Sequence, residues 1–246
     1  ASGNNQLMAL YVGRTLAYEA EPRMDDPDWF TRGGAGSYHW GNSPTSAWHV
    51  TINTNVRWGV ELLQQLGYED VRFYENYDYD RMAGQYHPWI RAMYNDGSNV
   101  ILSRAECYNW RSSFTGVNRN TVFPIRLNTS GHGEWATWWM TRSGSGNDLK
   151  GPVAATCGWG GPQTAPMTIF WLNLVKGVML HDMSLGWGRV FAGVNFERYF
   201  PNQQYYQQVK TDVDCYGDPG IQPWRGVPQI LALEHVESIS PQTRMV

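Results

Sequence analysis

Two residues of types that perform nucleophilic catalysis follow short apolar runs of the sequence. His132 stands between two glycines after the run that ends at Leu127, and Cys157 follows the run 153–155. Glycine on both sides leaves the imidazole little steric cover, which suits a general base. A thiolate at the end of a strand can act as a nucleophile. The two residues lie 25 positions apart, on what we expect to be consecutive strands, so their spacing permits a Cys/His dyad.

Both residues also have ordinary structural explanations. Cys157, directly after Val-Ala-Ala-Thr, is typical of a small buried apolar side chain, and Gly-His-Gly is also typical of a plain turn. The other two cysteines, Cys107 and Cys215, are expected to be structural or inert. The odd count and wide spacings exclude a disulfide framework. One bridge with a free thiol, or no bridge, remain open.

Other side chains suggest ligands of different chemistry. No CxxC or HExxH motif and no close His/Cys set indicates zinc. Two acidic groups could hold a hard cation such as calcium, although solvated loop carboxylates are the simpler interpretation. A tryptophan-rich stretch could stack a sugar, although packing under a loop is the default. The acidic groups are Asp25, Asp26 and Asp28, and Glu75, Asp78 and Asp80; the tryptophans are Trp135, Trp138 and Trp139.

The composition restricts the classes of partner. The chain of 246 residues has 19 Lys and Arg against 22 Asp and Glu, so it has no broad basic surface for nucleic acid. No run of about 18 apolar residues is present to span a membrane. Charged residues make up 17% and aromatics 14%, against roughly 25% charged in an ordinary domain, a balance commoner in secreted proteins. We therefore expect protein or peptide partners, and we expect any export signal to have been removed or to lie outside this chain.

Apolar runs and helical spacing alternate along the chain, which predicts an α/β fold around a mostly parallel sheet. Segment 19–46, rich in Asp, Gly and Pro, is predicted to be a long surface loop. Asn53 or Asn55 is a candidate cap for the helix at 56–66, and Gly67 marks its end. Strands are predicted at 7–12, 71–74, 99–102, 122–127, 152–157 and from 213, and helices at 56–66, 88–94, 169–180 and 185–196, the last two weakened by internal glycines. In such sheets the ligand site lies at the carboxyl ends of the strands.

Six short landmarks, in the same order, resemble the gingipain family of secreted, caspase-like cysteine peptidases. They are 10–14, 18–19 with 28–29, 67–68 followed by 71–74, 95–97, 184–186 and 217–219. The resemblance implies a caspase-like three-layer α/β/α sandwich with a mainly parallel sheet of about six strands. It also implies a cysteine peptidase site and a secreted or cell-surface location, with calcium as a candidate ligand and no certain cofactor.

The active site of that family can be aligned with this chain in two ways. In the first, His132 is the family's Gly-His-Gly base and Cys157 its nucleophile, so Cys157 attacks a peptide carbonyl while His132 protonates the leaving amine. In the second, which follows the landmarks on either side, the catalytic His slot falls in 103–106 and holds Glu106, and the nucleophile slot falls near Ser130. Both catalytic residues are then absent. A carboxylate does not take over the acid role of an imidazole near neutral pH without a strongly raised pKa.

The resemblance also divides the chain at residue 226. Residues 1–226 resemble the peptidase-fold domain, and 227–246 resemble the start of a C-terminal immunoglobulin-like module that continues beyond this chain. The expected function is that of a degenerate peptidase-fold domain of a secreted or cell-surface protein, which acts in binding or assembly with proteins, peptides, other copies or other modules. The alternative is an active cysteine endopeptidase with the His132/Cys157 dyad.

Overall fold

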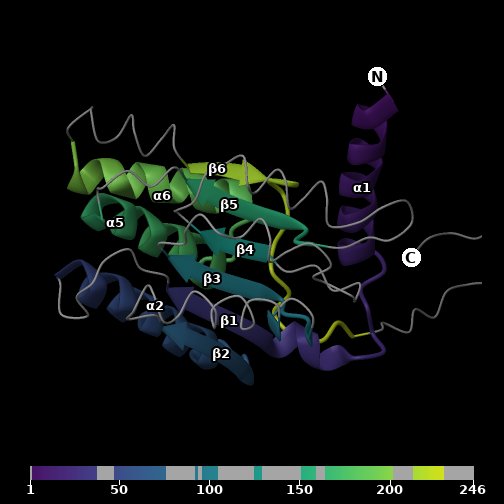
Figure 1. Ribbon diagram of the computed structural model, residues 1–246, viewed down its shortest axis with the longest axis horizontal. Helices are drawn as coiled ribbons and strands as arrows, with labels where there is room; N and C mark the ends of the chain where they lie inside the picture. Colours follow the sequence, from purple (N-terminus) through teal and green to yellow (C-terminus); the bar gives the residue numbers. More distant parts are fainter. Residues whose placement is uncertain are drawn as a thin grey trace, which may run out of the picture.

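The chain forms a six-stranded, mainly parallel β-sheet with helices packed on it (Figure 1). The computed structural model describes residues 2–37, 47–75, 92–93, 96–104, 125–128, 151–158, 164–201 and 213–229. In spatial order the strands are β2 (Asp70–Glu75), β1 (Arg32–Ser37), β3 (Val100–Arg104), β4 (Ile125–Asn128), β5 (Ala154–Gly158) and β6 (Val213–Tyr216). Strands β1 to β5 are parallel, and β6 is antiparallel to β5. The predicted α/β fold class is therefore confirmed.

Helices cover one face of the sheet, and the helical residue Met93 packs on the other. The helices are α1 (Ser2–Glu19), α2 (Ala47–Gln65), α5 (Thr164–Val175) and α6 (Leu185–Tyr199), with a 3₁₀ helix η1 (Pro27–Thr31) before β1 and a π-helical turn η3 (Lys176–Leu180) after α5. Helices α2, α5 and α6 lie together on one face (Figure 1). A Cβ added to Gly33 of β1 would meet Leu63 of α2, whereas one added to Gly34 would meet Met93. Met93 therefore lies on the opposite face, as a three-layer sandwich requires. Among the described residues, no helix is long and apolar enough to cross a membrane.

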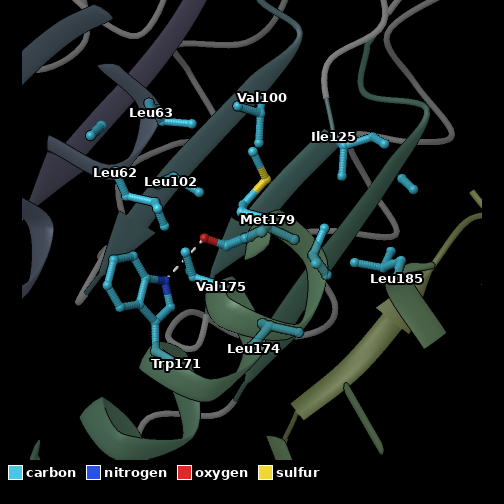
Figure 2. Close-up of a cluster of buried hydrophobic side chains, with 14 of the residues drawn as sticks. Leu62, Leu63, Val100, Leu102, Ile125, Trp171, Leu174, Val175, Met179 and Leu185 are labelled. Carbon is cyan, nitrogen blue, oxygen red and sulfur yellow. Dashed lines mark hydrogen bonds between the residues drawn. The ribbon is translucent and has the colours of Figure 1, made fainter. Parts of the chain in front are cut away.

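The main hydrophobic core lies between the sheet and α2, α5 and α6. Every second residue of β3 and β4 is buried in it, beginning with Val100 and Ile125, because strand side chains alternate between the two faces. Figure 2 shows Trp171 and Leu174 of α5 packed beneath these strands. The core thus fixes α5 against the centre of the sheet.

Most predicted elements lie where the sequence pattern placed them. The predicted strands at 71–74, 99–102 and 152–157 and from 213 correspond to β2, β3, β5 and β6, and the described part of 122–127 belongs to β4. The predicted helices at 56–66, 169–180 and 185–196 correspond to α2, to α5 with η3, and to α6. Of the helix predicted at 88–94, Ala92 and Met93 are helical, and the rest lies outside the described residues.

The predicted strand at 7–12 is wrong, because this segment belongs to α1. The landmark at 10–14 therefore is not a strand either. The buried residues of α1 are Leu10, Arg14 and Tyr18, which recur at every fourth position, the spacing of one helix face. The six apolar residues 7–12 are too few to reveal this helical period, because the helix continues to Glu19.

The predicted surface loop at 19–46 is also wrong in its central part, because Arg32–Ser37 forms β1 between β2 and β3. Glycine normally disfavours strands. Here the two faces of β1 are packed so closely that a Cβ at Gly34 would lie 1.9 Å from Met93 Cε. Tertiary packing of Met93 against Gly34 thus stabilises a strand where local preference predicted a loop.

The predicted caps of α2 are half right. Gly67 adopts a φ of 88° just after the helix, a conformation that favours glycine at helix ends. The start is wrong, because α2 begins at Ala47 and both Asn53 and Asn55 lie inside it. The helix starts well before Val56, the first residue of the apolar pattern used for the prediction.

The buried side chain of Asn99 joins several segments at the amino edge of the sheet. Its Nδ2 donates hydrogen bonds to the carbonyl oxygens of Phe30 at 2.9 Å and Trp224 at 2.6 Å, and to the hydroxyl of Tyr68 at 3.1 Å. Its Oδ1 accepts hydrogen bonds from the Trp224 N–H at 3.1 Å and the Tyr18 hydroxyl at 3.3 Å. One amide therefore connects α1, η1, the turn before β2, and the C-terminal segment.

That C-terminal segment, residues 217–225, is named the strap. It crosses the amino edge from β6 toward α1 (Figure 1). The Leu185 N–H at the start of α6 donates to the carbonyl of Ile221 at 2.9 Å, so the strap supplies an acceptor to a helix terminus that has none within the helix. Arg225 donates to the Val178 carbonyl of η3 at 2.6 Å. The strap thus closes the amino edge, while the loops that carry the candidate residues leave from the opposite edge.

Helices α5 and α6 approach each other closely through glycines. A Cβ added to Gly177 would lie 3.0 Å from the Cα of Gly188, and one added to Gly188 would lie 2.4 Å from Val178 Cγ2. Gly193, further along α6, has open space around it. Gly186, at the start of α6, is also crowded, because a Cβ there would lie 2.8 Å from Pro219 Cβ. The glycines that weaken these helices by propensity therefore serve different purposes: Gly177, Gly186 and Gly188 permit close packing, and Gly193 does not.

Two alanine substitutions in α6 separate these purposes. Gly188→Ala is expected to lower the free energy of unfolding by about 1–3 kcal/mol, because the new methyl group overpacks the contact with Val178. Gly193→Ala is expected to raise it by about 0.5–1 kcal/mol, because alanine favours helix and meets nothing. Urea unfolding of both variants measures the difference, and equal effects would contradict the packing role of Gly188.

Candidate functional site

The candidate site lies where the carboxyl ends of β1, β3, β4 and β5 meet. These strands are neighbours and parallel, so their carboxyl ends lie at one edge of the sheet. Strand β3 ends at Arg104, two residues before Glu106, and β4 ends at Asn128, two residues before Ser130. The described strand ends that lead toward Glu106 and Ser130 therefore lie at the same edge of the sheet as the end of β5 that carries Cys157.

Three of the four predicted catalytic residues lie outside the described residues: Glu106, Ser130 and His132. Cys107, which was expected to be structural or inert, and Trp135, Trp138 and Trp139 lie outside them as well. Cys157 lies within β5, one residue before its end, with its Cα opposite that of Asp214 in β6. The strands that precede His132 and contain Cys157 are adjacent and parallel. That arrangement is the one a dyad requires, and the distance between the two side chains stays a prediction.

Strands β4 and β5 are paired only at their beginnings. Their register joins Ile125 to Ala154 and Arg126 to Ala155, whereas β3 and β4 remain paired as far as Asn128. Beyond the short ladder, the carbonyl of Leu127 accepts a hydrogen bond from the indole Nε1 of Trp171 at 3.2 Å (Figure 2). The carboxyl end of β4 is thus held by α5 as well as by β3.

Replacing this indole tests its role at the candidate edge. Trp171→Phe is expected to lower the free energy of unfolding by about 1–3 kcal/mol, because the buried Leu127 carbonyl loses a donor. The control is Trp187→Phe on the outside of α6, where the side chain is 69% exposed, and a change of less than about 0.5 kcal/mol is expected. Denaturant unfolding measures both, and similar losses in the two variants would contradict the role of Trp171.

A polar pair that the sequence analysis missed lies at the carboxyl end of β1. The Ser37 hydroxyl donates to Asn53 Oδ1 at 2.5 Å, and both residues are buried. Within the described part of the chain, Asn53 Nδ2 is buried without a hydrogen-bond partner. Strand β2, which follows β1 in the sequence, lies on one side of β1, and β3, which comes next, lies on the other side. The carboxyl end of β1 is therefore the topological switch point, where α/β sheets form ligand sites. The glycine run before Ser37 concealed the strand, and Asn53 was interpreted as a cap.

The thiol of Cys215 is unsuited to catalysis near neutral pH. The side chain is half-buried and free, and burial raises the pKa of the thiol to about 11, partly opposed by the charge of Arg189. The Cα of Cys215 pairs with that of Thr156, next to Cys157. Since the thiolate is the nucleophile, Cys215 stays protonated and unreactive at this position.

The described acidic residues do not fit a calcium site. Arg23 binds both carboxylate oxygens of Asp25, at 2.6 and 3.0 Å, and this hydrogen bonding lowers the pKa of Asp25. Asp26 lies 3.8 Å from the guanidinium of Arg32. Among the described residues, no three His, Cys, Asp or Glu side chains are grouped as metal ligands. Asp78 and Asp80 lie outside the described residues.

Comparison with known proteins identifies the fold. The sequence matches no family model and no curated protein. Solved structures do match. The RgpB pro- and mature-domain complex of Porphyromonas gingivalis has a TM-score of 0.71 at 12% identity, over 89% of this chain and 54% of that one. The chain has a gingipain-like fold.

Two further solved structures support this gingipain-like fold. The Arg-specific cysteine proteinase gingipain R (RgpB) has a TM-score of 0.67 at 13% identity, over 90% of this chain and 54% of that one. A structure described as a protease has a TM-score of 0.72 at 12% identity, over 97% of this chain and 58% of that one. The chain thus spans a little more than half the length of the proteins it matches.

Proposed function

We propose that this chain is a catalytically degenerate, gingipain-like peptidase-fold domain of a secreted or cell-surface protein, and that it acts in binding or assembly. The observation that carries the proposal is the segment that follows β3. Strand β3 ends with Ser103 and Arg104, and Glu106 stands in the slot where the flanking landmarks place the catalytic histidine. The low content of charged residues supports a secreted or cell-surface location, and the high content of aromatic residues supports protein or peptide partners.

The described landmarks support the alignment that leaves the site degenerate. Gly97 before β3 and Gly217 after β6 both have positive φ, of 80° and 94°, so each occupies a turn that favours glycine. Ser184 occupies the N-cap position of α6, without a side-chain hydrogen bond to the helix. These landmarks support the alignment with a histidine slot directly after β3 and a nucleophile slot directly after β4.

The residues in those slots lack the chemistry of a cysteine peptidase. A leaving amine needs a proton from a group with a pKa near the working pH, and an unperturbed glutamate side chain, with a pKa of about 4.3, does not meet that need. Ser130 in the nucleophile slot would need a strong neighbouring base to attack a peptide. With neither partner matched, the carboxyl edge is better suited to holding a protein segment than to cleaving it.

An active endopeptidase with Cys157 and His132 is the second candidate. The adjacency of β4 and β5 favours it, since the two residues would then flank one part of the carboxyl edge. Against it, the end of β5 at Cys157 is paired with β6, and the landmark alignment assigns β5 to a strand after the nucleophile.

Alkylation distinguishes the two candidates. In the degenerate domain, His132→Ala is expected to change the iodoacetamide labelling rate of Cys157 by less than about twofold near neutral pH, because no imidazole activates the thiol. Peptide mapping by mass spectrometry measures each cysteine separately. A fall of more than about threefold, together with loss of chloromethyl ketone labelling, would overturn the degenerate assignment in favour of the dyad.

Cys215 provides an internal reference in the same experiment. Its thiol pKa of about 11 predicts slow labelling at neutral pH and a rate that rises about tenfold per unit between about pH 8 and pH 10, because the thiolate fraction rises in that proportion. A rate for Cys215 that is independent of pH in this range would contradict the assigned burial of the thiol.

We also propose that the peptidase-fold domain ends at residue 226 and that 227–246 begin a following module. Arg225 makes the last anchoring contacts of the strap, with Val178 and Asp182, and Val227 is already exposed. A chain ending at Gly226 is expected to unfold cooperatively, within about 1 kcal/mol of the full chain. A chain ending at Tyr216 should lose about 3 kcal/mol or more, since it lacks the fully buried Ile221. Denaturant unfolding of the two truncations checks the boundary, and equal stability would contradict it.

A further inference from the structure

Helix α1 and the strap share the same hydrogen-bonding groups. The Tyr18 hydroxyl of α1 donates to the carbonyl of Gln222 at 3.0 Å and accepts from the Trp224 N–H at 3.2 Å. The rings of Tyr18 and Trp224 lie 5.8 Å apart, and Trp224 meets Phe30 edge-on at 5.6 Å. The two ends of the described chain, more than 200 positions apart, are therefore fastened to each other as well as to the sheet.

The contact between α1 and the strap is less regular than the packing between the sheet and its helices. The strap contains no helix or strand, and its contact with α1 depends on one hydroxyl and a few aromatic rings. The indole Nε1 of Trp224 is buried without a hydrogen-bond partner among the described groups, a cost that opening would remove because water could then reach it. The outer side of α1 carries three exposed apolar side chains, Met8, Val12 and Leu16. This side of the helix therefore buries little apolar surface against the described structure.

Most side chains of the α/β core come from the sheet and from α2, α5, η3 and α6, while α1 and the strap each add one fully or nearly buried member, Tyr18 and Ile221. Asn99, although it binds the strap, is also held by backbone hydrogen bonds from its N–H to Arg32 and from Ile125 N–H to its carbonyl, both 2.9 Å. These ladder bonds remain when the strap leaves.

We infer that α1 and the strap form a terminal clasp, which opens as one cooperative unit while the α/β core remains folded. The strap has no helix or strand, and segments with few buried apolar contacts and little regular structure open at lower free energy than a packed sheet. Because α1 and the strap share bonding partners, loss of one weakens the other. Opening frees the chain after residue 225 from the amino edge, so the clasp controls where the following part of the chain lies. This inference is independent of the proposed function, because the clasp lies at the edge opposite the candidate site.

Removing one hydroxyl tests the clasp. Tyr18→Phe keeps the ring contacts with Trp224 but removes the bonds of the hydroxyl to Gln222, Trp224 and Asn99. Hydrogen exchange with mass spectrometry on the full chain is expected to show about tenfold faster exchange in both the last two turns of α1 and the strap, with no change in β3, β4 and α5. The matched control is Tyr199→Phe on α6, where the hydroxyl is exposed, and no segment should change.

Three results would overturn the inference. Faster exchange in α1 without the strap, or in the strap without α1, would show that they open separately. Equal acceleration in every segment would show that opening is global unfolding. Unchanged exchange everywhere would show that the Tyr18 hydroxyl does not hold the clasp.

Limited proteolysis provides a second measurement. Trypsin cleavage after Arg225, whose guanidinium binds Asp182 at 2.6 Å and the Val178 carbonyl at the same distance, is expected to be about tenfold faster in Tyr18→Phe than in the Tyr199→Phe control, because cleavage requires the strap to leave the edge. A core fragment that stays intact after this cut supports the clasp, whereas immediate digestion of β3 and α5 contradicts it.

Discussion

The side chain of Asn99 is the interaction on which closure of the amino edge of the sheet depends. A buried amide must have its donors and acceptor satisfied, and here its partners come from α1, η1, the turn before β2, and the strap. Because Asn99 directly precedes β3, the same residue places this central strand and closes the amino edge. Any other side chain of this size would leave several of these buried groups unpaired.

Closure of one edge determines which edge can carry function. The parallel strands deliver their carboxyl ends to the opposite side of the sheet, where the segments after β3 and β4 begin. There the ladder of hydrogen bonds between β4 and β5 is short, and the indole of Trp171 donates a hydrogen bond to the carbonyl of Leu127, beyond the end of that ladder. The candidate site is thus a consequence of strand direction and unequal pairing, and the nature of the side chains in the slots distinguishes a peptidase from a binding domain.

Sequence reasoning was reliable where the structure is locally encoded. The helices of α5 and α6 followed from apolar density, and the glycines at 67, 97 and 217 marked turns that do adopt positive φ. It failed at 7–12, where a six-residue window concealed a four-residue period. It failed again at β1, where glycines that normally indicate a loop are closely approached by Met93 and Leu63. It gave no indication of the Ser37–Asn53 pair, which exists only once β1 and α2 are in place.

The order of residue types along the chain was enough to predict the α/β alternation and the turn at Gly67, because each depends on neighbours within about ten positions. Long-range contacts were needed to place a glycine-rich strand in the middle of the sheet and to give Asn99 its partners. Tyr18 and Trp224 lie 81 and 125 positions from Asn99, so no local pattern could have revealed that these groups meet. Their pairing follows from the free energy of burying polar atoms together, which arises only after the chain has folded.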